Sequence, residues 1–174
     1  MKSSSHSVIH LLVLDVDGVL TDGRLYYGAR GEALKVFHVR DGQGIKALQA
    51  SGVTVAVISG RRSAATLRRC RELDIRHVFQ SIDNKLACLE KICKRLRIAL
   101  AESAAVGDDT ADVAVLRAVG RSFAPADAHR DAHAAAQQIT RLRGGHGAVR
   151  EVCDALLATR AAARIPAPAA RRAR

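Results

Sequence analysis

Reactive side chains stand at the ends of several predicted buried strands of this chain. Each follows an apolar run directly or opens the next helix, and the set is Asp15, Ser59, Lys85, Asp108 and Asp109. In an open parallel sheet the carboxyl ends of the strands meet at one edge, where ligands bind. The sequence therefore predicts one crevice that holds three carboxylates, a hydroxyl group and an ammonium group.

Three carboxylates in one crevice repel one another unless a cation lies among them. Hard oxygen donors of this kind suit Mg²⁺, which commonly binds one or two carboxylates together with substrate phosphate oxygen and water. Ser59 and Lys85 are then left to hold the oxygens of a phosphoryl group. These residue types predict a reaction of a phosphate ester with Mg²⁺ as the cofactor.

The motif DVDG at residues 15–18 gives its two acids different tasks. A carboxylate nucleophile forms a covalent phosphoryl intermediate and divides one difficult step into two easier ones. A second carboxylate two residues on can protonate the leaving alcohol and then deprotonate the attacking water. Gly18 lets the chain turn sharply, so that both acids face the same phosphorus atom. We therefore predict that Asp15 is the nucleophile and that Asp17 is the general acid and base.

The hydrophobic pattern predicts an α/β chain in which strands alternate with helices. Strands are expected at 11–15, 53–58, 77–79, 104–106 and 122–124, and a hairpin is expected at 25–27 and 33–37 around a turn with two glycines. Helices are expected at 41–51 with Asp41 as their cap, and at 63–73, 84–97, 111–119, 131–138 and 148–159. This alternation is typical of one Rossmann-like parallel sheet flanked by helices.

Length and composition limit the chain to one folded domain. It has 174 residues, of which 48% are apolar, and we expect the domain at 1–159. Residues 160–174 form a basic tail whose Ala, Pro and Arg content predicts disorder. No apolar run reaches the ~20 residues of a membrane span. The four cysteines have no CxxC or metal-binding spacing, so we expect a reducing cytosol.

The net charge of +11 first suggests a protein that binds nucleic acid. Five of these charges come from arginines of the tail, which contains no acid. A second arginine cluster lies within residues 61–71, where an anionic small substrate explains it as well as nucleic acid does. Aromatic residues make up only 3% of the chain and do not alternate with the basic ones, which argues against a surface that stacks single-stranded bases.

Four motifs, in this order along the chain, resemble those of the haloacid dehalogenase superfamily. They are residues 15–21 (DVDGVLT), residues 58–61 (ISGR), Lys85 and residues 107–109 (GDD). Further stretches resemble the family of 3-deoxy-D-manno-octulosonate 8-phosphate (KDO-8-phosphate) phosphatases. These stretches are residues 25–28 (LYYG), 37–42 (FHVRDG), 44–46 (GIK) and 144–151 (GGHGAVRE). The resemblance covers roughly residues 8–157.

This resemblance implies a hydrolase without a large cap domain, which has only a short β-hairpin flap. It implies hydrolysis of KDO-8-phosphate to KDO and phosphate through a phospho-aspartyl intermediate, in the synthesis of a lipopolysaccharide precursor. It also implies a homotetramer in which the hairpin packs against neighbouring subunits and the glycine-rich segment at 144–147 covers a site. An inert linker is the alternative interpretation of that segment.

The resemblance also assigns roles to residues. Asp15, the main-chain carbonyl of Asp17 and the carboxylate of Asp108 would hold Mg²⁺, and Asp109 and Asp112 would support this site. The catalytic residues would be Asp15, Asp17, Ser59 and Lys85. The substrate-binding residues would be Asp17, His38, Val39, Arg40, Asp41, Gly42, Ser59, Gly60, Arg61, Arg69 and Lys85. The choice of Arg69 over the neighbouring arginines rests on the resemblance alone, and Ser81 stands where the family's pattern implies a glycine.

Simpler roles remain open for several of these residues. His38 can cap the end of the hairpin, Asp109 can cap a helix, and Asp112 can stabilise the first turn of its helix. The nearest enzymatic alternative is a phosphatase for sialic acid 9-phosphate or another small phosphoester. A phospho-acceptor receiver domain is disfavoured, because it carries its paired acids after the first strand and its acceptor after the third. The remaining alternative is a basic nucleic-acid-binding protein.

Overall fold

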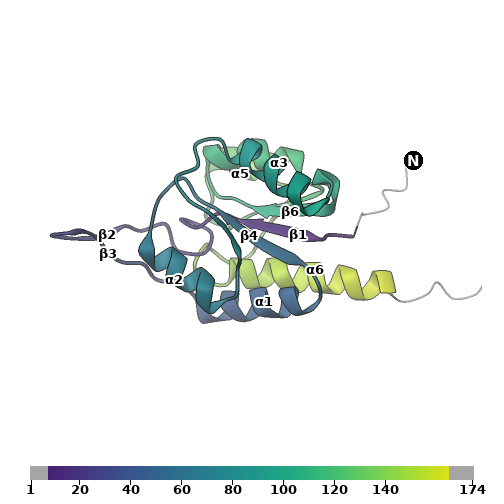
Figure 1. Cartoon of the computed structure of the whole chain (residues 1–174), viewed down its shortest axis with the longest axis horizontal. Coiled ribbons are helices and arrows are strands. Elements are labelled where there is room, and N and C mark those ends of the chain that lie inside the picture. Colours follow the sequence, from purple (N-terminus) through teal and green to yellow (C-terminus); the bar gives the residue numbers. More distant parts are fainter. Residues whose placement is uncertain (1–7, 165–174) are drawn as a thin grey trace, which may run out of the picture.

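A six-stranded parallel sheet organises the computed structural model of the chain, which describes residues 8–164 (Figure 1). The strand order is β5-β4-β1-β6-β7-β8, and each neighbouring pair runs parallel. This confirms the predicted Rossmann-like α/β class. The strands are β1 (Leu11–Leu14), β4 (Thr54–Ile58), β5 (His77–Phe79), β6 (Ser103–Val106), β7 (Arg121–Ala124) and β8 (Gln138–Ile139).

Helices cover both faces of this sheet, with α1, α2 and α6 on one side and α3, α4 and α5 on the other (Figure 1). The side chains of β1 alternate between the two sides. Leu12 and Leu14 pack in the core under α1 and α6, and Leu11 and Val13 pack in the core under α3 and α4. The helices are α1 (Val39–Ala50), α2 (Ala64–Glu72), α3 (Lys85–Leu96), α4 (Val113–Ala118), α5 (Arg130–Ala135) and α6 (Ala148–Arg164), with the 3₁₀ turns η1 (Leu100–Glu102) and η2 (Thr110–Asp112).

The strand order reverses beside β1. From β1 the chain moves outward to β4 and β5, and then returns across the sheet to β6, β7 and β8. Ligands of open α/β sheets bind at such a reversal, outside the carboxyl ends of the strands. Leu14 is in register with Val106, so the loops that begin at Asp15 and Gly107 leave the sheet side by side.

A short antiparallel hairpin lies between β1 and α1. It consists of β2 (Tyr26–Gly28) and β3 (Gly31–Leu34), and it projects away from the body of the molecule (Figure 1). The described residues contain no further inserted domain, in agreement with the expected small flap. The described residues also contain no helix that is long and apolar enough to cross a membrane.

The start of α1 differs from the prediction. The helix begins at Val39, and its N-cap is His38, whose Nδ1 accepts a hydrogen bond from the Arg40 backbone N–H at 3.2 Å. Asp41, which we expected to be the cap, lies buried in the first turn and accepts from the backbone N–H of Arg150 at 2.8 Å. A carboxylate in this position completes the hydrogen bonding at the start of a different helix, α6.

The region at 131–138 is only partly helical. Helix α5 ends at Ala135, and residues 138–139 form the edge strand β8, which the sequence pattern did not predict. Phe123 of β7 is in register with Gln138, and the Thr140 backbone N–H donates to Ala124 at 2.9 Å. Pairing with the free edge of β7 therefore outweighs the helical propensity of this alanine-rich stretch.

The C-terminal helix is longer than predicted. It continues to Arg164, beyond the expected end of the helix at residue 159. Arg160 donates from its guanidinium group to the backbone carbonyls of Ile9 at 2.6 Å and Ser51 at 3.0 Å. These bonds join α6 to the segments that precede β1 and β4, at the amino-terminal edge of the sheet. The predicted tail from residue 165 onward lies outside the described residues.

Candidate active site

The candidate nucleophile lies at the carboxyl end of the central strand. Asp15 follows β1, its backbone N–H donates to Val106 at 3.1 Å, and its carboxylate is buried. Lys85 at the start of α3 lies 3.0 Å from Asp15 Oδ1. Burial, followed by the nearby charge of Asp112, raises the pKa of Asp15 to about 6 against the opposing effect of Lys85.

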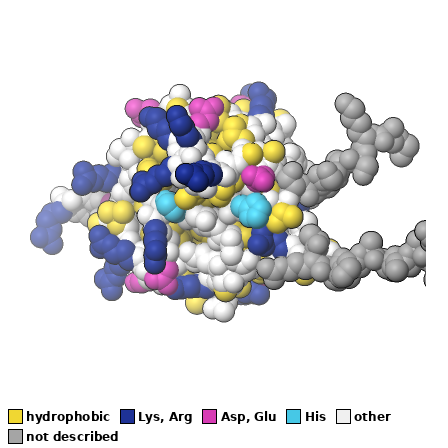
Figure 2. All heavy atoms as spheres, turned by 45° about the vertical axis from the view of Figure 1, so that its right-hand side comes forward, with side chains coloured by type: hydrophobic (Ala, Val, Ile, Leu, Met, Phe, Trp, Pro, Cys, Tyr) yellow, Lys and Arg dark blue, Asp and Glu magenta, His cyan; other side chains and the backbone are white. Residues whose placement is uncertain are grey.

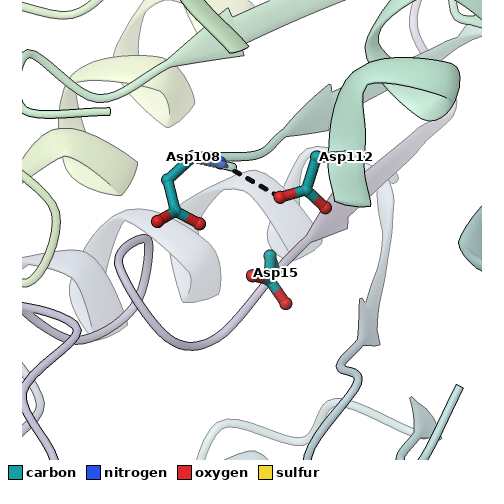
Figure 3. A group of neighbouring side chains, drawn as sticks. All are labelled: Asp15, Asp108 and Asp112. Atoms are coloured by element: carbon teal, nitrogen blue, oxygen red, sulfur yellow. Dashed lines mark hydrogen bonds between the residues drawn. The ribbon is translucent and has the colours of Figure 1, made fainter. Parts of the chain in front are cut away.

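Two further carboxylates face the nucleophile. One ligand atom each from Asp15, Asp108 and Asp112 lies within 4.8 Å of the others, and the three side chains converge on the same space (Figure 3). Burial raises the pKa of Asp108 to about 8, and the charges of Asp15 and Asp112 add to this rise. Of the three acids that the sequence predicted in one crevice, Asp15 and Asp108 come together here, with Asp112 in the place expected for Asp109.

The three acids differ in how many oxygen atoms they leave for a ligand. Asp112 is fully used, because Oδ1 accepts from Lys85 at 2.7 Å and Oδ2 accepts from the backbone N–H groups of Asp108 and Asp109 at 3.1 and 3.3 Å. By contrast, Asp108 Oδ1 is buried and has no hydrogen-bond partner among the described residues. A buried, unpartnered carboxylate oxygen beside a second carboxylate fits a divalent cation.

Two other residues lie at this cluster, Asp109 next to Asp108 in the chain and Lys85 between two of the acids. Asp109 is exposed, caps η2 and accepts from the Thr110 N–H at 2.7 Å, so the structure places it as a cap. Lys85 is buried between two acids. Burial lowers its pKa, but Asp15 and then Asp112 raise it by more, and the net change is upward. The ammonium group therefore stays charged beside the nucleophile.

Asp17 is not a member of this cluster of acids. Its Oδ1 accepts a hydrogen bond from Lys35, and its Oδ2 lies 3.7 Å from Arg61 Nε. The Arg61 side chain is 42% exposed, and its guanidinium group also donates a hydrogen bond to the Tyr27 hydroxyl of the hairpin at 2.9 Å. The two acids of the DVDG motif thus have separate surroundings, as their separate predicted roles require.

Gly18 has its own reason to be glycine. Its φ is +83°, and a Cβ there would lie 2.0 Å from Asp108 Oδ2. Any side chain at this position would therefore displace the carboxylate of Asp108.

The glycines at 144 and 145 pack on the loop that follows the nucleophile. A Cβ on Gly144 would lie 1.8 Å from the Gly18 carbonyl oxygen, and the Gly145 N–H donates to the Val19 carbonyl at 3.0 Å. The expected covering of a site in the assembly stays a prediction, whereas within one chain these two glycines have a packing role. They permit close approach between two backbone segments of one chain, and they support the loop that carries Asp17.

The predicted phosphate-binding residues follow β4. Ser59 is buried, and its Oγ accepts from the Arg61 backbone N–H at 3.2 Å, which shapes the turn through the exposed Gly60. This turn lies at the carboxyl edge of the sheet, next to the β1 loop, because Leu14 is in register with Val57. The structure therefore brings Ser59 and Arg61 to the same edge as Asp15.

The remaining predicted substrate contacts gather at the start of α1. The Arg69 guanidinium group lies against Gly42, where a Cβ would approach Nη2 to 2.3 Å, and the Arg69 side chain is 21% exposed compared with 84% for Arg68. This favours Arg69 as the inward-facing arginine. Val39 and Arg40 are exposed, whereas His38 and Asp41 are engaged in the backbone hydrogen bonds described above.

Sequence reasoning missed Lys35, which contacts Asp17, and Glu32, which lies near Lys35. Lys35 is buried, and Glu32 lies 3.6 Å from it. A signal was available, because Lys35 interrupts the otherwise apolar stretch at 33–37. A charged residue within an apolar run is unusual in a core and indicates a buried partner of opposite charge.

Ser81 adopts the backbone conformation that the expected glycine would favour. Its φ is +58°, in the left-handed region that costs a non-glycine residue roughly 1 kcal/mol. Ser81→Gly would remove this cost but would also give the unfolded chain more conformational freedom, which offsets part of the gain. We therefore expect the substitution to raise the free energy of unfolding by about 0.5 kcal/mol. Urea denaturation tests this. Ser81→Ala is the control and should give no gain, and a Gly variant no more stable than the Ala variant would contradict the expectation.

Comparisons with known proteins agree with this fold and site. A family model of haloacid dehalogenase-like hydrolases matches residues 77–151. The chain is 49% identical, over 149 residues, to the KDO-8-phosphate phosphatase of Escherichia coli K12, which covers 86% of this chain and 79% of that protein. The Moraxella catarrhalis KDO-8-phosphate phosphatase has been solved with a magnesium ion, a phosphate ion and KDO. It superposes with a TM-score of 0.85 at 40% identity, over 88% of each chain. The Yersinia pestis phosphatase gives a TM-score of 0.87 at 43% identity, over 90% of this chain and 84% of that one.

A parallel sheet with acids at the ends of β1 and β6, a lysine at the start of α3 and only a hairpin as a flap defines a haloacid dehalogenase-like hydrolase. Within this class, the sequence identity to the relatives and the share of each chain that they cover assign the chain to a narrower family. The chain belongs to the family of KDO-8-phosphate phosphatases.

Proposed function

We propose that this protein is a Mg²⁺-dependent phosphatase that hydrolyses KDO-8-phosphate to KDO and phosphate. The observation that carries the proposal is the arrangement around Asp15, where a buried carboxylate lies between Lys85 and the unpartnered oxygen of Asp108. Its relatives of known structure and name act on this sugar phosphate, and the Moraxella protein holds magnesium together with phosphate and KDO. A cytosolic location remains a prediction.

The residues that would hold Mg²⁺ are the carboxylates of Asp15 and Asp108 and the main-chain carbonyl of Asp17. When bound, the ion would neutralise the carboxylates and polarise the phosphoryl group. Asp112 would hold Lys85 and the backbone of residues 108–109 in place, because both of its oxygens are already bonded to them.

The protein residues divide the reaction into two steps. In the first, an Asp15 oxygen attacks phosphorus while the bond from phosphorus to the sugar oxygen breaks, and Asp17 gives its proton to that oxygen. In the second, Asp17 takes a proton from water as the water oxygen attacks phosphorus. The bond between Asp15 and phosphorus then breaks, which releases phosphate and restores the carboxylate. Lys85 and Ser59 hold the phosphoryl oxygens throughout.

A sugar acid brings a carboxylate as well as a phosphate to the site. Arg61 and Arg69 suit this substrate, because a guanidinium group binds a carboxylate through two parallel hydrogen bonds. The main alternative, sialic acid 9-phosphate, carries the same two groups on a larger sugar. We propose that His38, Val39, Arg40, Asp41 and Gly42 form the wall of the site toward the sugar.

The test is a comparison of kcat/KM for KDO-8-phosphate, sialic acid 9-phosphate and simple phosphomonoesters with and without Mg²⁺. We expect turnover only with the metal and a clear preference for KDO-8-phosphate. A preference for sialic acid 9-phosphate would replace the substrate but keep the chemistry. Absence of turnover with any phosphomonoester would contradict the proposed function.

Asp17→Asn should lower kcat/KM for KDO-8-phosphate by about 10²–10⁴-fold, because an amide cannot exchange the proton. If only the main-chain carbonyl binds the metal, the Mg²⁺ concentration that gives half-maximal activity should stay within about twofold of the wild-type value. Titration of the variant with Mg²⁺ checks both expectations. A large rise in the Mg²⁺ requirement would show that the side chain is itself a ligand.

We also propose that the hairpin mediates a homotetramer. The segment that contains it exposes several large apolar side chains, which are Leu25, Tyr26, Tyr27, Leu34, Val36 and Val39. Exposed apolar clusters of this kind often mark protein interfaces. Light scattering during size-exclusion chromatography should give four times the chain mass for the wild type. Tyr27→Asp together with Leu34→Asp should reduce this mass, and a monomeric wild type would refute the assembly.

Nucleic-acid binding has less support. Figure 2 shows Lys and Arg side chains scattered over the face in view, with hydrophobic and acidic side chains between them. In the described part of the chain, several of the basic side chains also form ion pairs with neighbouring acids. A nucleic-acid-binding assay across a range of salt concentrations would reveal a contribution of the tail at 165–174.

A further inference from the structure

We propose that Lys35, in the segment after β3, is a positioning residue that orients the Asp17 carboxylate for proton transfer. The inference rests on the proposed phosphatase function, and it assigns part of the catalytic apparatus to the hairpin. It concerns how Asp17 is held, and it leaves the identity of the nucleophile and the metal ligands unchanged.

The first observation is the burial of the lysine. The Lys35 side chain is only 2% exposed, although an ammonium group is strongly hydrated in water. Burial of such a charge is costly unless a partner of opposite charge compensates it. The described partners are Asp17, which accepts a hydrogen bond from Nζ, and Glu32, whose Oε2 lies 3.6 Å away.

The second observation is the way in which Glu32 is held. Its Oε1 accepts a hydrogen bond from the Ser63 hydroxyl, and Ser63 is the N-cap of α2. Its Oε2 is buried and has no hydrogen-bond partner among the described residues, so its nearest compensation is the Lys35 charge at 3.6 Å. Because α2 fixes Glu32, the lysine is held between an anchored carboxylate on one side and Asp17 on the other.

The third observation is the asymmetry at Asp17. Lys35 occupies Oδ1, whereas Oδ2 has only the Arg61 Nε at 3.7 Å, which is beyond hydrogen-bonding distance. One oxygen is therefore fixed and the other remains available to exchange a proton. A carboxylate held by one oxygen has less rotational freedom, and such restraint keeps a general acid within reach of the leaving oxygen.

A comparison of leaving groups separates this role from a merely structural one. An alkoxide such as the sugar oxygen of KDO-8-phosphate needs a proton as it leaves, whereas p-nitrophenolate is a weak base and leaves without one. kcat/KM reports the steps up to departure of the leaving group. A loss of orientation at Asp17 should therefore reduce kcat/KM for the alkyl ester much more than for p-nitrophenyl phosphate.

The experiment measures both substrates with wild-type protein, Lys35→Met and Lys35→Arg at saturating Mg²⁺. We expect Lys35→Met to lose about 10- to 100-fold more kcat/KM with KDO-8-phosphate than with p-nitrophenyl phosphate, part of the ~10²–10⁴-fold that acid–base catalysis supplies. Lys35→Arg keeps the cation and should restore the ratio of the two substrates to within about threefold of wild type. Lys46→Met, which removes an exposed lysine paired with Asp74, is the matched control and should not change the ratio.

Loss of Lys35 leaves two carboxylates near each other, which threatens the fold of the single variant. Glu32→Gln combined with Lys35→Met removes the uncompensated buried charge, and this double variant should fold and show the same change in substrate ratio. Equal losses for both substrates, or no loss, in a folded variant would overturn the inference. Wild-type protein that hydrolyses neither ester would instead contradict the proposed function, so the two failures are distinguishable.

Discussion

Asp15→Asn protein should fold normally and lose turnover by about 10⁴-fold or more, the size of effect that loss of a catalytic nucleophile produces. An amide has nearly the same shape as the carboxylate but is a far poorer nucleophile and a weaker metal ligand. The fold should tolerate the change because Asp15 is buried close to two other acids, and the substitution removes a like charge from this cluster. Lys85 keeps its hydrogen bond to Asp112 in the variant.

Steady-state turnover of KDO-8-phosphate measures this loss, and circular dichroism with thermal unfolding confirms the fold. Intact mass spectrometry should accompany the assay, because deamidation of the new Asn would regenerate the wild-type acid. Ser59→Ala provides a graded comparison, since it removes one contact to the phosphoryl group and leaves the nucleophile. A folded, chemically intact Asp15→Asn protein that retains more than a few per cent of wild-type activity would exclude the covalent mechanism.

Asp108→Asn should abolish stabilisation by Mg²⁺ and yet make the metal-free protein more stable at alkaline pH. In the folded, metal-free state, burial raises the pKa of Asp108 to about 8, whereas the unfolded value is 3.8. The folded state therefore holds a proton that the unfolded state has lost, and stability decreases as pH rises from about 4 to 8. The total decrease is on the order of a few kcal/mol. An Asn at this position carries no such cost.

The measurement is chemical denaturation at pH 5 and pH 8, in a metal chelator and in excess Mg²⁺. Without metal, the stability advantage of the variant over the wild type should be small at pH 5 and much larger at pH 8. With Mg²⁺, only the wild type should gain stability. Asp109→Asn is the matched control, because Asn also caps helices and Asp109 lies exposed beside the cluster. A variant that is less stable than the wild type at pH 8 without metal would contradict the account.

The site residues that lie just after the ends of strands could be predicted from the sequence. Asp15 and Ser59 come directly after buried apolar strands, and Asp108 follows the end of β6 after one intervening residue, so parallel pairing alone brings them to one edge. Lys85 could be predicted for the same reason, since it is the first residue of the helix after β5. For these residues, the position in the sheet and the type of side chain both indicate the same site.

Residues whose roles depend on tertiary contacts could not be predicted in this way. Asp41 looked like a local helix cap, but the close approach of α6 turns its carboxylate to the backbone of Arg150, and Gly44 permits that approach. Lys35 forms its hydrogen bond to Asp17 although the two residues are 18 positions apart in the chain. Hydrophobic periodicity carries no information on such pairs, because it describes one element at a time.

The edge strand β8 and the true end of α6 were missed for a related reason. The stretch at 136–139 contains helix-forming residues, but pairing with the free edge of β7 decides its conformation. The end of α6 is stabilised by the bonds of Arg160 to Ile9 and Ser51, which lie far away in sequence. In both places tertiary contacts override the local signal.

The most direct test of the central claim is capture of the phosphorylated enzyme. Wild-type protein that is turning over KDO-8-phosphate with Mg²⁺ is quenched rapidly in acid and reduced with borohydride, which converts an aspartyl phosphate into homoserine. The peptide that contains β1 and the DVDG motif is then sequenced by mass spectrometry. The account predicts homoserine at position 15, with Asp17 and Asp108 unmodified. Rapid turnover without modification of Asp15, or modification at another residue, would contradict it.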